Sequence, residues 1–328
     1  MVRKKLYLLL VLNLFLMGCS CCYAQKHRPD SNYIRYFEKP NIIEAYTGKY
    51  STNFNFSSPD ERKTNYKLVA NSSAYIGADL NYKWLTLNYS MAIPGTQVDR
   101  HVRLEYTSAS TRFSGKQTVF RPFYSSYNGL LIPDKDSLHV YTPFKGIQFT
   151  RGGIDFYYYF NKSNFSFHTA NYFSNQQIKS AGSLFIMATP QWQKIKWKDP
   201  SRDIISDTAT FNLLSSNPQW LSVILRAGYA YIFAFEKGKW RIAPSVIAGA
   251  GGVREISTPN KSLNIATDIQ LLLDAGYDGP NYYIYLKTSW DNLKTNLFYK
   301  SLSQVHADFS ITGGYRFHHF RKKIMRIL

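Results

Sequence analysis

The chain has 328 residues, a formal net charge of +19 at pH 7 and 16% aromatic residues, among them 26 Tyr and 22 Phe. This length suffices for one large all-β domain or two ordinary ones. A basic chain can bind nucleic acid, but the N-terminal sequence described next predicts export, and neither a basic helix nor zinc-finger spacing is present, so no nucleic-acid partner is expected.

The N-terminus has the pattern of a secretory signal. A basic start, RKK, precedes an apolar run over residues 6–17, and small residues follow as far as Ala24. We expect residues 1–24 to be a signal peptide that is cleaved before Gln25. The alternative is a lipoprotein, because the stretch LMGC ending at Cys19 resembles a lipobox. All three cysteines lie within this segment, so the mature chain would have no disulfide framework.

After a short periplasmic lead-in over residues 25–41, the chain alternates between apolar and polar residues. In residues 72–95, SSAYIGADLNYKWLTLNYSMAIPG, Ala74 and Ile76 belong to one face while Tyr75 and Asp79 belong to the other. The chain turns at 83–84 and alternates again on its return. This period of two predicts a tight β-hairpin.

The same alternation recurs to the end of the chain, most clearly over residues 305–317. It predicts strands at 42–56, 66–82, 84–93, 101–114, 117–127, 146–160, 181–193, 219–235, 239–254, 262–277, 281–292 and 304–317. An even number of strands is typical of a bacterial outer-membrane barrel. Residues 161–180 could hold two more strands or a periplasmic excursion, so 10 to 14 strands stay open.

Alternation alone does not distinguish a soluble sandwich from a membrane barrel. Three features favour the barrel: the apolar faces are aromatic-rich at their ends, the polar faces use Asn, Ser, Thr and Gly, and the last strand ends at Phe317. Short turns also fall on the side of the termini, and long connections on the other. We therefore predict an all-β fold, a single transmembrane antiparallel β-barrel over residues 42–317, followed by a basic periplasmic tail over 318–328.

Three runs carry a family resemblance: FNKSNFSFHTANYFSNQQIKSAGS, YKWLTLNYSMAIPGTQVDR and the closing GGYRF. They resemble the Bacteroidetes family catalogued as domain of unknown function 4421, over most of the chain from about Tyr33 to Phe317. The resemblance implies an exported outer-membrane barrel and supplies no catalytic residue. The chain departs from the family pattern at His168 and Thr169.

If the polar faces point inward, charged residues of both signs gather in the lumen. They could form salt bridges that fill a narrow barrel, or they could line a solute path or a ligand site. The candidate ligand-binding residues are Arg103, Glu105, Arg226, Asp268, Asp274, Asp308 and Arg316, and Asp79, Asp155 and Lys287 share the predicted lumen.

Catalysis has weaker support in the sequence. Ser166 and His168 lie two apart in an extended segment, and Asp155 could complete a hydrolase triad, but no nucleophile-elbow motif is present. We assign no catalytic residue, and an outer-membrane lipid-modifying enzyme of the acyl hydrolase type stays an alternative.

No cofactor or metal is expected either. The run GAGG at 249–252 has Arg254 where a dinucleotide loop needs its third glycine. His318 and His319 have no acid or Cys at ligand spacing.

The expected location is the outer membrane, and the expected partners are its lipids, lipopolysaccharide and the barrel-assembly machinery. Lys194, Lys196, Lys198 and Arg202 crowd a predicted outer loop, where they could contact lipopolysaccharide phosphates or be solvated. The predicted role is solute transport or ligand binding through a partly filled polar lumen. A lipid-anchored surface β protein attached through Cys19 is the third possibility.

Overall fold

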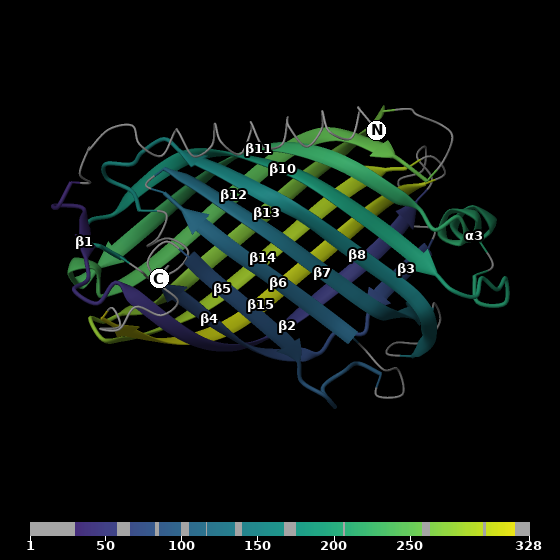
Figure 1. The fold of residues 1–328 in the computed structure, drawn as a ribbon, viewed down its shortest axis with the longest axis horizontal. Helices are drawn as coiled ribbons and strands as arrows, with labels where there is room; N and C mark the ends of the chain where they lie inside the picture. Colours follow the sequence, from purple (N-terminus) through teal and green to yellow (C-terminus); the bar gives the residue numbers. More distant parts are fainter. Residues whose placement is uncertain are drawn as a thin grey trace, which may run out of the picture.

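The computed structural model describes residues 30–57, 66–82, 85–99, 105–115, 117–134, 140–166, 175–205, 207–257, 263–297 and 300–318. The elements, in chain order, are β1 (Ile34–Tyr36), β2 (Asn41–Ser57), β3 (Tyr66–Ala70), β4 (Ala74–Tyr82), β5 (Leu85–Ala92), β6 (Glu105–Ser114), β7 (Thr118–Pro133), β8 (Tyr141–Tyr159), β9 (Asn175–Gln177), β10 (Ala181–Trp197), α3 (Thr208–Ser215), β11 (Gln219–Phe235), η2 (Glu236–Gly238), β12 (Trp240–Glu255), β13 (Leu263–Asp278), β14 (Tyr282–Asn296) and β15 (Ser301–Phe317). The long strands wrap around one barrel, tilted against its long axis, with β1 at one end and α3 at the other (Figure 1).

The strands close a ring. Among the described residues, twelve strands pair in the order β2, β4, β5, β6, β7, β8, β10, β11, β12, β13, β14, β15, each antiparallel to the next, and β15 pairs back onto β2. In this closing pair, residues 41–57 face residues 301–317 without interruption. Closure leaves no exposed strand edge in the ring. The prediction of a single all-β barrel of about twelve antiparallel strands is confirmed.

The barrel narrows by two strands along its axis. Both β3 and β4 pair with β2, β3 at residues 53–56 and β4 at residues 42–49. On their other side β4 pairs with β5, whereas β3 pairs directly with β7. At the level of β3, ten of the described strands therefore close the ring. We call the wide end, where β2 begins and β15 finishes, the terminal end, and the narrow end the distal end.

The narrowing is fixed by the segment 71–73 between β3 and β4. The Asn71 side chain donates to the backbone carbonyl of Asp99 at 2.8 Å and accepts from the Asp99 amide at 2.9 Å. Pairing with β2 shifts by one residue across this segment, as at a β-bulge. The two hydrogen bonds of Asn71 therefore tie the connection after β5 to the segment between β3 and β4. The single strand predicted over 66–82 is corrected to two strands, because the chain changes its pairing partner there.

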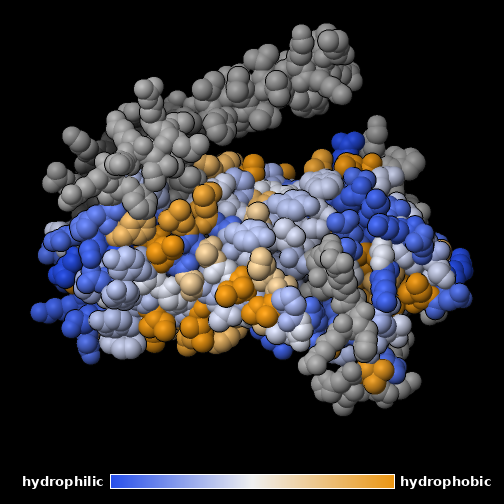
Figure 2. Space-filling view, turned by 60° about the horizontal axis from the view of Figure 1, so that its bottom comes forward, coloured by the Kyte–Doolittle hydropathy of each residue, from blue (hydrophilic) through white to orange (hydrophobic). Residues whose placement is uncertain are grey.

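Apolar side chains point outward from the wide part of the barrel. They form a ring that we call the apolar belt, and the most exposed members include Leu184, Leu225 and Ile265 at 61–63%. Every ring strand contributes, as in Ile43, Ile76, Leu87, Phe113, Tyr124, Phe156, Ile186, Leu225, Val246, Ile269, Leu286 and Ile311. Figure 2 shows hydrophobic side chains gathered between two hydrophilic ends. The predicted outward orientation of the apolar faces is therefore correct over the belt.

Beyond the belt, toward the distal end, the two faces of the wall exchange their character. On β10 the inward residues Thr189, Gln191 and Gln193 are polar, whereas Ile195 and Trp197 beyond them are apolar and buried. Nearer the terminal end, inward Phe185 belongs to a second, smaller apolar cluster. The outward residues change in the opposite sense, from apolar side chains to Lys194 and Lys196. A wall with a polar outside and an apolar inside is typical of a sheet in water. We call this part the distal extension.

An apolar core fills the distal extension. All ten strands that close the ring there contribute buried side chains to one cluster, including Phe54, Leu68, Phe149, Trp220 and Leu302. Helix α3 covers the cluster and adds Leu213 and Leu214, both fully buried. No helix in the described part of the chain is long and apolar enough to cross a membrane.

The cap of α3 ties this helix to the barrel. The Asp207 carboxylate accepts the Thr210 amide at 2.9 Å at the helix N-terminus. Lys300, buried in the connection between β14 and β15, lies 3.0 Å from the same carboxylate. The helix is therefore fixed to the rim from which the last strand starts.

The terminal end carries a small second sheet in which β1 pairs with β9. Gly238 in the η2 turn lies against this sheet with a φ of 86°, and a Cβ there would come within 2.2 Å of the Gln177 carbonyl oxygen. Glycine meets both demands, the positive φ and the close approach. The described part of residues 161–180 adds β9 to this sheet and no strand to the ring.

Several predicted strands are too short at the distal end. The strands predicted over 117–127, 181–193 and 281–292 extend to residues 133, 197 and 296. Lys194 and Lys196 are consequently on β10 and not in a loop, while Lys198 and Arg202 follow the strand as predicted. On β10 and β14 the alternation reverses its phase where the outer solvent changes from lipid to water, and such a reversal resembles the end of a strand. On β7 a bulge between Asn128 and Leu130 also shifts the alternation.

Candidate functional site in the lumen

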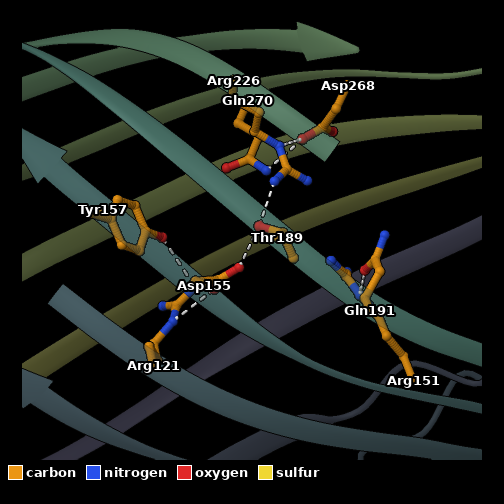
Figure 3. A network of polar contacts seen from close by, with 9 residues as sticks. All are labelled: Arg121, Arg151, Asp155, Tyr157, Thr189, Gln191, Arg226, Asp268 and Gln270. Atoms are coloured by element: carbon orange, nitrogen blue, oxygen red, sulfur yellow. Dashed lines mark hydrogen bonds and ion pairs between the residues drawn. The ribbon is translucent and has the colours of Figure 1, made fainter. Parts of the chain in front are cut away.

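A chain of polar contacts runs along the inner face of the wall at the level of the belt (Figure 3). Arg121 on β7 forms an ion pair with Asp155 on β8 at 2.6 Å. The second oxygen of Asp155 accepts the Thr189 hydroxyl at 2.8 Å, and Thr189 accepts an N–H of Arg226 at 2.6 Å. Arg226 in turn pairs with Asp268 on β13. The chain connects five strands, so it stabilises the wall as well as filling the lumen.

Side-chain amides continue the polar layer. Gln270 donates to Asp268 at 2.7 Å, and Arg151 donates to Gln191 at 2.8 Å (Figure 3). Gln304 on β15 donates to Gln193 on β10 at 2.7 Å, between strands on opposite sides of the barrel. These bonds partner groups that would otherwise be unsatisfied in the interior.

A cavity of about 240 Å³ lies beside this layer, against β2, β4, β5, β6, β14 and β15. Its lining combines tyrosine rings, hydroxyl groups and charges of both signs. The residues are Glu44, Tyr46, Tyr50, Tyr75, Asp79, Thr86, Asn88, Ser90, Tyr106, Ser110, Thr111, Arg112, Arg121, Tyr285, Lys287, His306, Asp308, Ser310 and Thr312. We call this space the lumen cavity.

Hydrogen bonds hold the polar groups of the cavity in place. The Tyr75 hydroxyl donates to Asp308 at 2.7 Å, and Asn88 donates to the Tyr46 hydroxyl at 2.9 Å. Arg112 donates to the Thr86 hydroxyl at 2.8 Å. Because these groups are already oriented, a polar guest would meet donors and acceptors in fixed positions.

Tyrosines separate the cavity from the distal core. Tyr50 and Tyr127 belong to the apolar cluster, and Tyr106 packs between them with ring centroids at 4.7 Å and 4.8 Å. Near them, His306 shares a 2.8 Å hydrogen bond with Thr52. The cavity is thus walled by aromatic rings on its distal side.

On the side of β14 and β15, the terminal end is filled by an arginine between two rings. The guanidinium of Arg316 lies 3.6 Å from the centroid of Phe37 and 4.5 Å from that of Tyr283. It forms an ion pair with Asp278 and donates to the Gly279 carbonyl at 3.1 Å. The N-terminal lead-in is thereby packed against the last strand.

The structure separates the seven candidate residues. Of the five whose side chains are described, Asp308 alone lines the lumen cavity, while Arg226 and Asp268 form the buried pair of the polar layer. Asp274 is buried opposite Lys287 on β14, and Arg316 belongs to the filled terminal end. Arg103 and the side chain of Glu105 lie outside the described residues.

The residues suggested for a hydrolase triad show no assembled site. Both Asp155 oxygens are engaged by Arg121 and Thr189. Ser166 is buried at the terminal end, within 3.5 Å of the Asn175 amide, and His168 lies outside the described residues. In the described ranges, no group of three or more His, Cys, Asp or Glu could hold a metal ion.

The candidate list missed most of the cavity. Tyr46, Tyr50 and Tyr106 point inward, but a tyrosine is equally typical of the aromatic girdles outside a membrane barrel. Glu44 and Arg112 could have been found from their place on the polar face of their strands.

Together these features define a class: a membrane-spanning β-barrel with an outward apolar belt and a lumen that polar and apolar side chains largely fill. The chain belongs to the family described as Domain of unknown function (DUF4421), whose model matches residues 28–317. The predicted family is confirmed, and its restriction to Bacteroidetes stays a prediction. No curated protein matches the chain.

Solved structures similar in fold are outer-membrane barrels. The beta domain of the Bordetella autotransporter Brka is 10% identical, with 84% of this chain and 100% of that chain covered and a TM-score of 0.46. The outer membrane protease OmpT from Escherichia coli is 6% identical, with 88% and 100% covered and a TM-score of 0.33. OprG from Pseudomonas aeruginosa is 8% identical, with 88% and 100% covered and a TM-score of 0.27. With TM-scores below 0.5, these likenesses say nothing of what this barrel does.

Proposed function

We propose that this protein is an outer-membrane barrel that binds one small polar molecule in its lumen and forms no open pore. The lumen cavity is the observation that carries the proposal, because it is a polar space within an otherwise filled barrel. The location rests on the exposed apolar belt, which a protein dissolved in water would not present around its whole girth.

The filled distal extension argues against a pore. Side chains from all ten strands, together with Leu213 and Leu214 of α3, form one contiguous buried cluster across it. A water-filled channel needs a continuous polar path, as in large porins. Insertion into a planar bilayer should therefore give negligible current, and a steady ionic conductance of the unaltered protein would contradict the closed lumen.

The charges of the cavity define the class of ligand. Three carboxylates, Glu44, Asp79 and Asp308, face the cations Arg112 and Lys287, while the third cation of the lining, Arg121, is paired with Asp155. Charges of both signs that nearly cancel give little preference for an anion or a cation. Tyrosine rings and hydroxyl groups suit a neutral polyol or a zwitterion of the size of a monosaccharide or an amino acid.

Calorimetric titration of the folded barrel in neutral detergent tests this proposal. Glucose serves as the neutral probe, serine as the zwitterion, and phosphate and spermidine as the charged comparisons. We expect measurable binding of glucose or serine that exceeds binding of both charged probes. No heat from either glucose or serine would overturn the proposed ligand class.

Single-residue variants test whether the ligand binds in the lumen cavity. Tyr75→Phe and Arg112→Gln change groups that line the cavity, so each should weaken binding by roughly tenfold, the usual effect of one lost hydrogen bond to a charged or oriented group. The matched control is Tyr229→Phe, whose ring is exposed on the belt. Equal affinity in all three variants would place the binding elsewhere.

The proposed location in the outer membrane can be tested separately from ligand binding. The chain should be recovered in the outer-membrane fraction and migrate faster on a gel before heating than after it, as intact barrels do. Recovery in the soluble fraction without detergent would contradict the location, and incorporation of labelled palmitate at Cys19 would favour the lipid-anchored alternative.

A further inference from the structure

The outward face of the barrel carries an arc of cations immediately beyond the apolar belt. Five basic residues occupy outward strand positions on the distal side of the belt, on strands between β10 and β2 in the ring order. They are Lys49 on β2, Lys194 and Lys196 on β10, Arg254 on β12 and Lys294 on β14. We call this arc the basic collar.

The collar lies at the edge of the belt on each strand. On β10 the last outward apolar residue is Trp192, and Lys194 is the next outward position. On β14 the last is Trp290, and Lys294 is two outward positions further on. A lysine stem can lie along apolar surface while its ammonium reaches water, so these charges sit at the level of lipid headgroups.

The collar has no acidic neighbours on its own strands. On β2, β10, β12 and β14, the other outward positions beyond the belt are residues 51, 53, 55, 57, 292 and 296, which are all Ser or Asn. None of the five collar residues takes part in an ion pair within the described part of the chain. The lumen and the terminal end, by contrast, pair both signs of charge. Charge of one sign without partners favours an anionic ligand.

We propose that the basic collar binds the phosphate groups of lipopolysaccharide in the leaflet that surrounds the distal end. The inference rests on the proposed location in the outer membrane, and it is independent of the lumen cavity. Several separate cations around the wall suit the sugar-linked phosphates of many lipid molecules better than one ligand at a single site. Contact with phosphate should be charge-assisted and sensitive to salt.

The test uses the full mature chain folded in dodecyl maltoside, with lipid A added as the phosphate-bearing probe. We expect bound phosphorus to accompany the barrel through gel filtration and the thermal unfolding midpoint to rise. Both effects should decrease at high salt. Phosphatidylglycerol distinguishes any anionic lipid from lipid A, and phosphatidylcholine is the zwitterionic comparison.

The collar variant replaces all five residues by Gln. We expect its apparent affinity for lipid A to fall by roughly tenfold or more, since each basic residue near an anionic surface contributes to attraction. The matched control replaces five basic residues at the terminal end by Gln: Arg35, Lys162, Lys179, Lys237 and Lys239. A second variant that exchanges the four collar lysines for Arg should retain binding.

Heat-modifiable migration in the absence of lipid shows whether each variant folds. Full lipid A binding by a folded collar variant would overturn the inference, as would equal binding of phosphatidylcholine by the unaltered protein. Tighter binding of phosphatidylglycerol than of lipid A would overturn the choice of lipopolysaccharide. A chain that is soluble without detergent would instead contradict the location on which the inference rests.

Discussion

The Arg226–Asp268 ion pair is more enclosed than the Arg121–Asp155 pair in the same polar layer. Each side chain of the first pair is 1% exposed. Two buried charges cost free energy to remove from water, and their attraction offsets this cost only while both are present. The pair therefore stabilises the fold chiefly by avoiding a lone buried charge.

Arg226→Met should destabilise the barrel by about 3–5 kcal/mol, because it leaves Asp268 charged and without its main partner. The double variant Arg226→Met/Asp268→Leu should recover much of this loss. Urea unfolding followed by tryptophan fluorescence gives the comparison. A double variant less stable than the single one would mean that the pair is net stabilising.

The cap of α3 gives a pH dependence. Burial would raise the pKa of Asp207, but hydrogen bonds from Thr210 and Lys300 and the Lys300 charge outweigh it, so the pKa is lowered from the ordinary 3.8. A carboxyl whose pKa is depressed on folding adds stability above its unfolded pKa and loses it as the pH falls through the folded one. Its contribution should be constant from neutral pH down to about 4.

Asp207→Asn tests this expectation through proteolysis of the segment that contains α3. At neutral pH the variant should be cleaved faster than the unaltered protein, and the difference should shrink below about pH 4. A difference that persists unchanged at pH 3 would show that the charge of Asp207 contributes nothing.

At the residue scale, the sequence could identify polar side chains of the lumen but not their grouping. Asp79 and Tyr75 follow from alternation in residues 72–95, and Asp308 follows from alternation near the C-terminus. The contact between Tyr75 and Asp308 joins residues 233 positions apart, and the register of the closing pair sets it. Periodicity assigns a face to a residue and carries no information on register.

At the scale of elements, aromatic rings of one strand pack over glycines of the next. Tyr46 lies opposite Gly77, Phe185 opposite Gly228, and Tyr283 opposite Gly314. A Cβ at each of these glycines would come within 2.0–2.5 Å of the facing ring. Because glycine has no Cβ, it leaves the space in which the facing ring lies against the wall.

Gly314→Ala should destabilise the barrel by about 1–3 kcal/mol through overpacking. The Tyr283 ring cannot move away freely, because it is buried and its hydroxyl donates to Glu44 at 2.7 Å. Gly313→Ala is the matched control on the same strand, since a Cβ there meets nothing within 4 Å. It should be neutral or stabilising by up to about 1 kcal/mol. Equal urea midpoints for the two variants would refute the packing argument.

The elements themselves were largely predictable from the sequence, and the errors share a physical origin. All twelve ring strands were found, because two different solvents on the two faces impose a period of two. Their distal ends were missed because the outer solvent changes from lipid to water along one strand. The interruption between β3 and β4 at residues 71–73 was missed because it arises from a change of neighbouring strand, and alternation carries no information on which strand is the neighbour.

At the scale of the whole molecule, an outward arginine should be costly in the belt and nearly neutral in the distal extension. Leu225 is 63% exposed in the belt, whereas Asn53 points outward from the extension. Leu225→Arg should lower stability by about 2–4 kcal/mol when the barrel is folded into lipid vesicles. Asn53→Arg should change it by less than about 0.5 kcal/mol, as is usual for a substitution in water.

Reversible unfolding in guanidinium from vesicles measures both variants. In detergent micelles the two variants should lose similar amounts of stability, because a micelle adapts to a surface charge more readily than a bilayer does. Equal losses for the two variants in vesicles would show that the bilayer covers the extension as well.

The taper from twelve strands to ten has a consequence for traffic. The lumen cavity is in the broad part, and the apolar cluster of the distal extension separates it from the distal end. With the distal end facing the outside of the cell, as the proposed location implies, a ligand of the proposed kind would enter from the periplasmic side. Binding should then respond to solutes added to the periplasmic side of a membrane and not to the same solutes added only to the outer side.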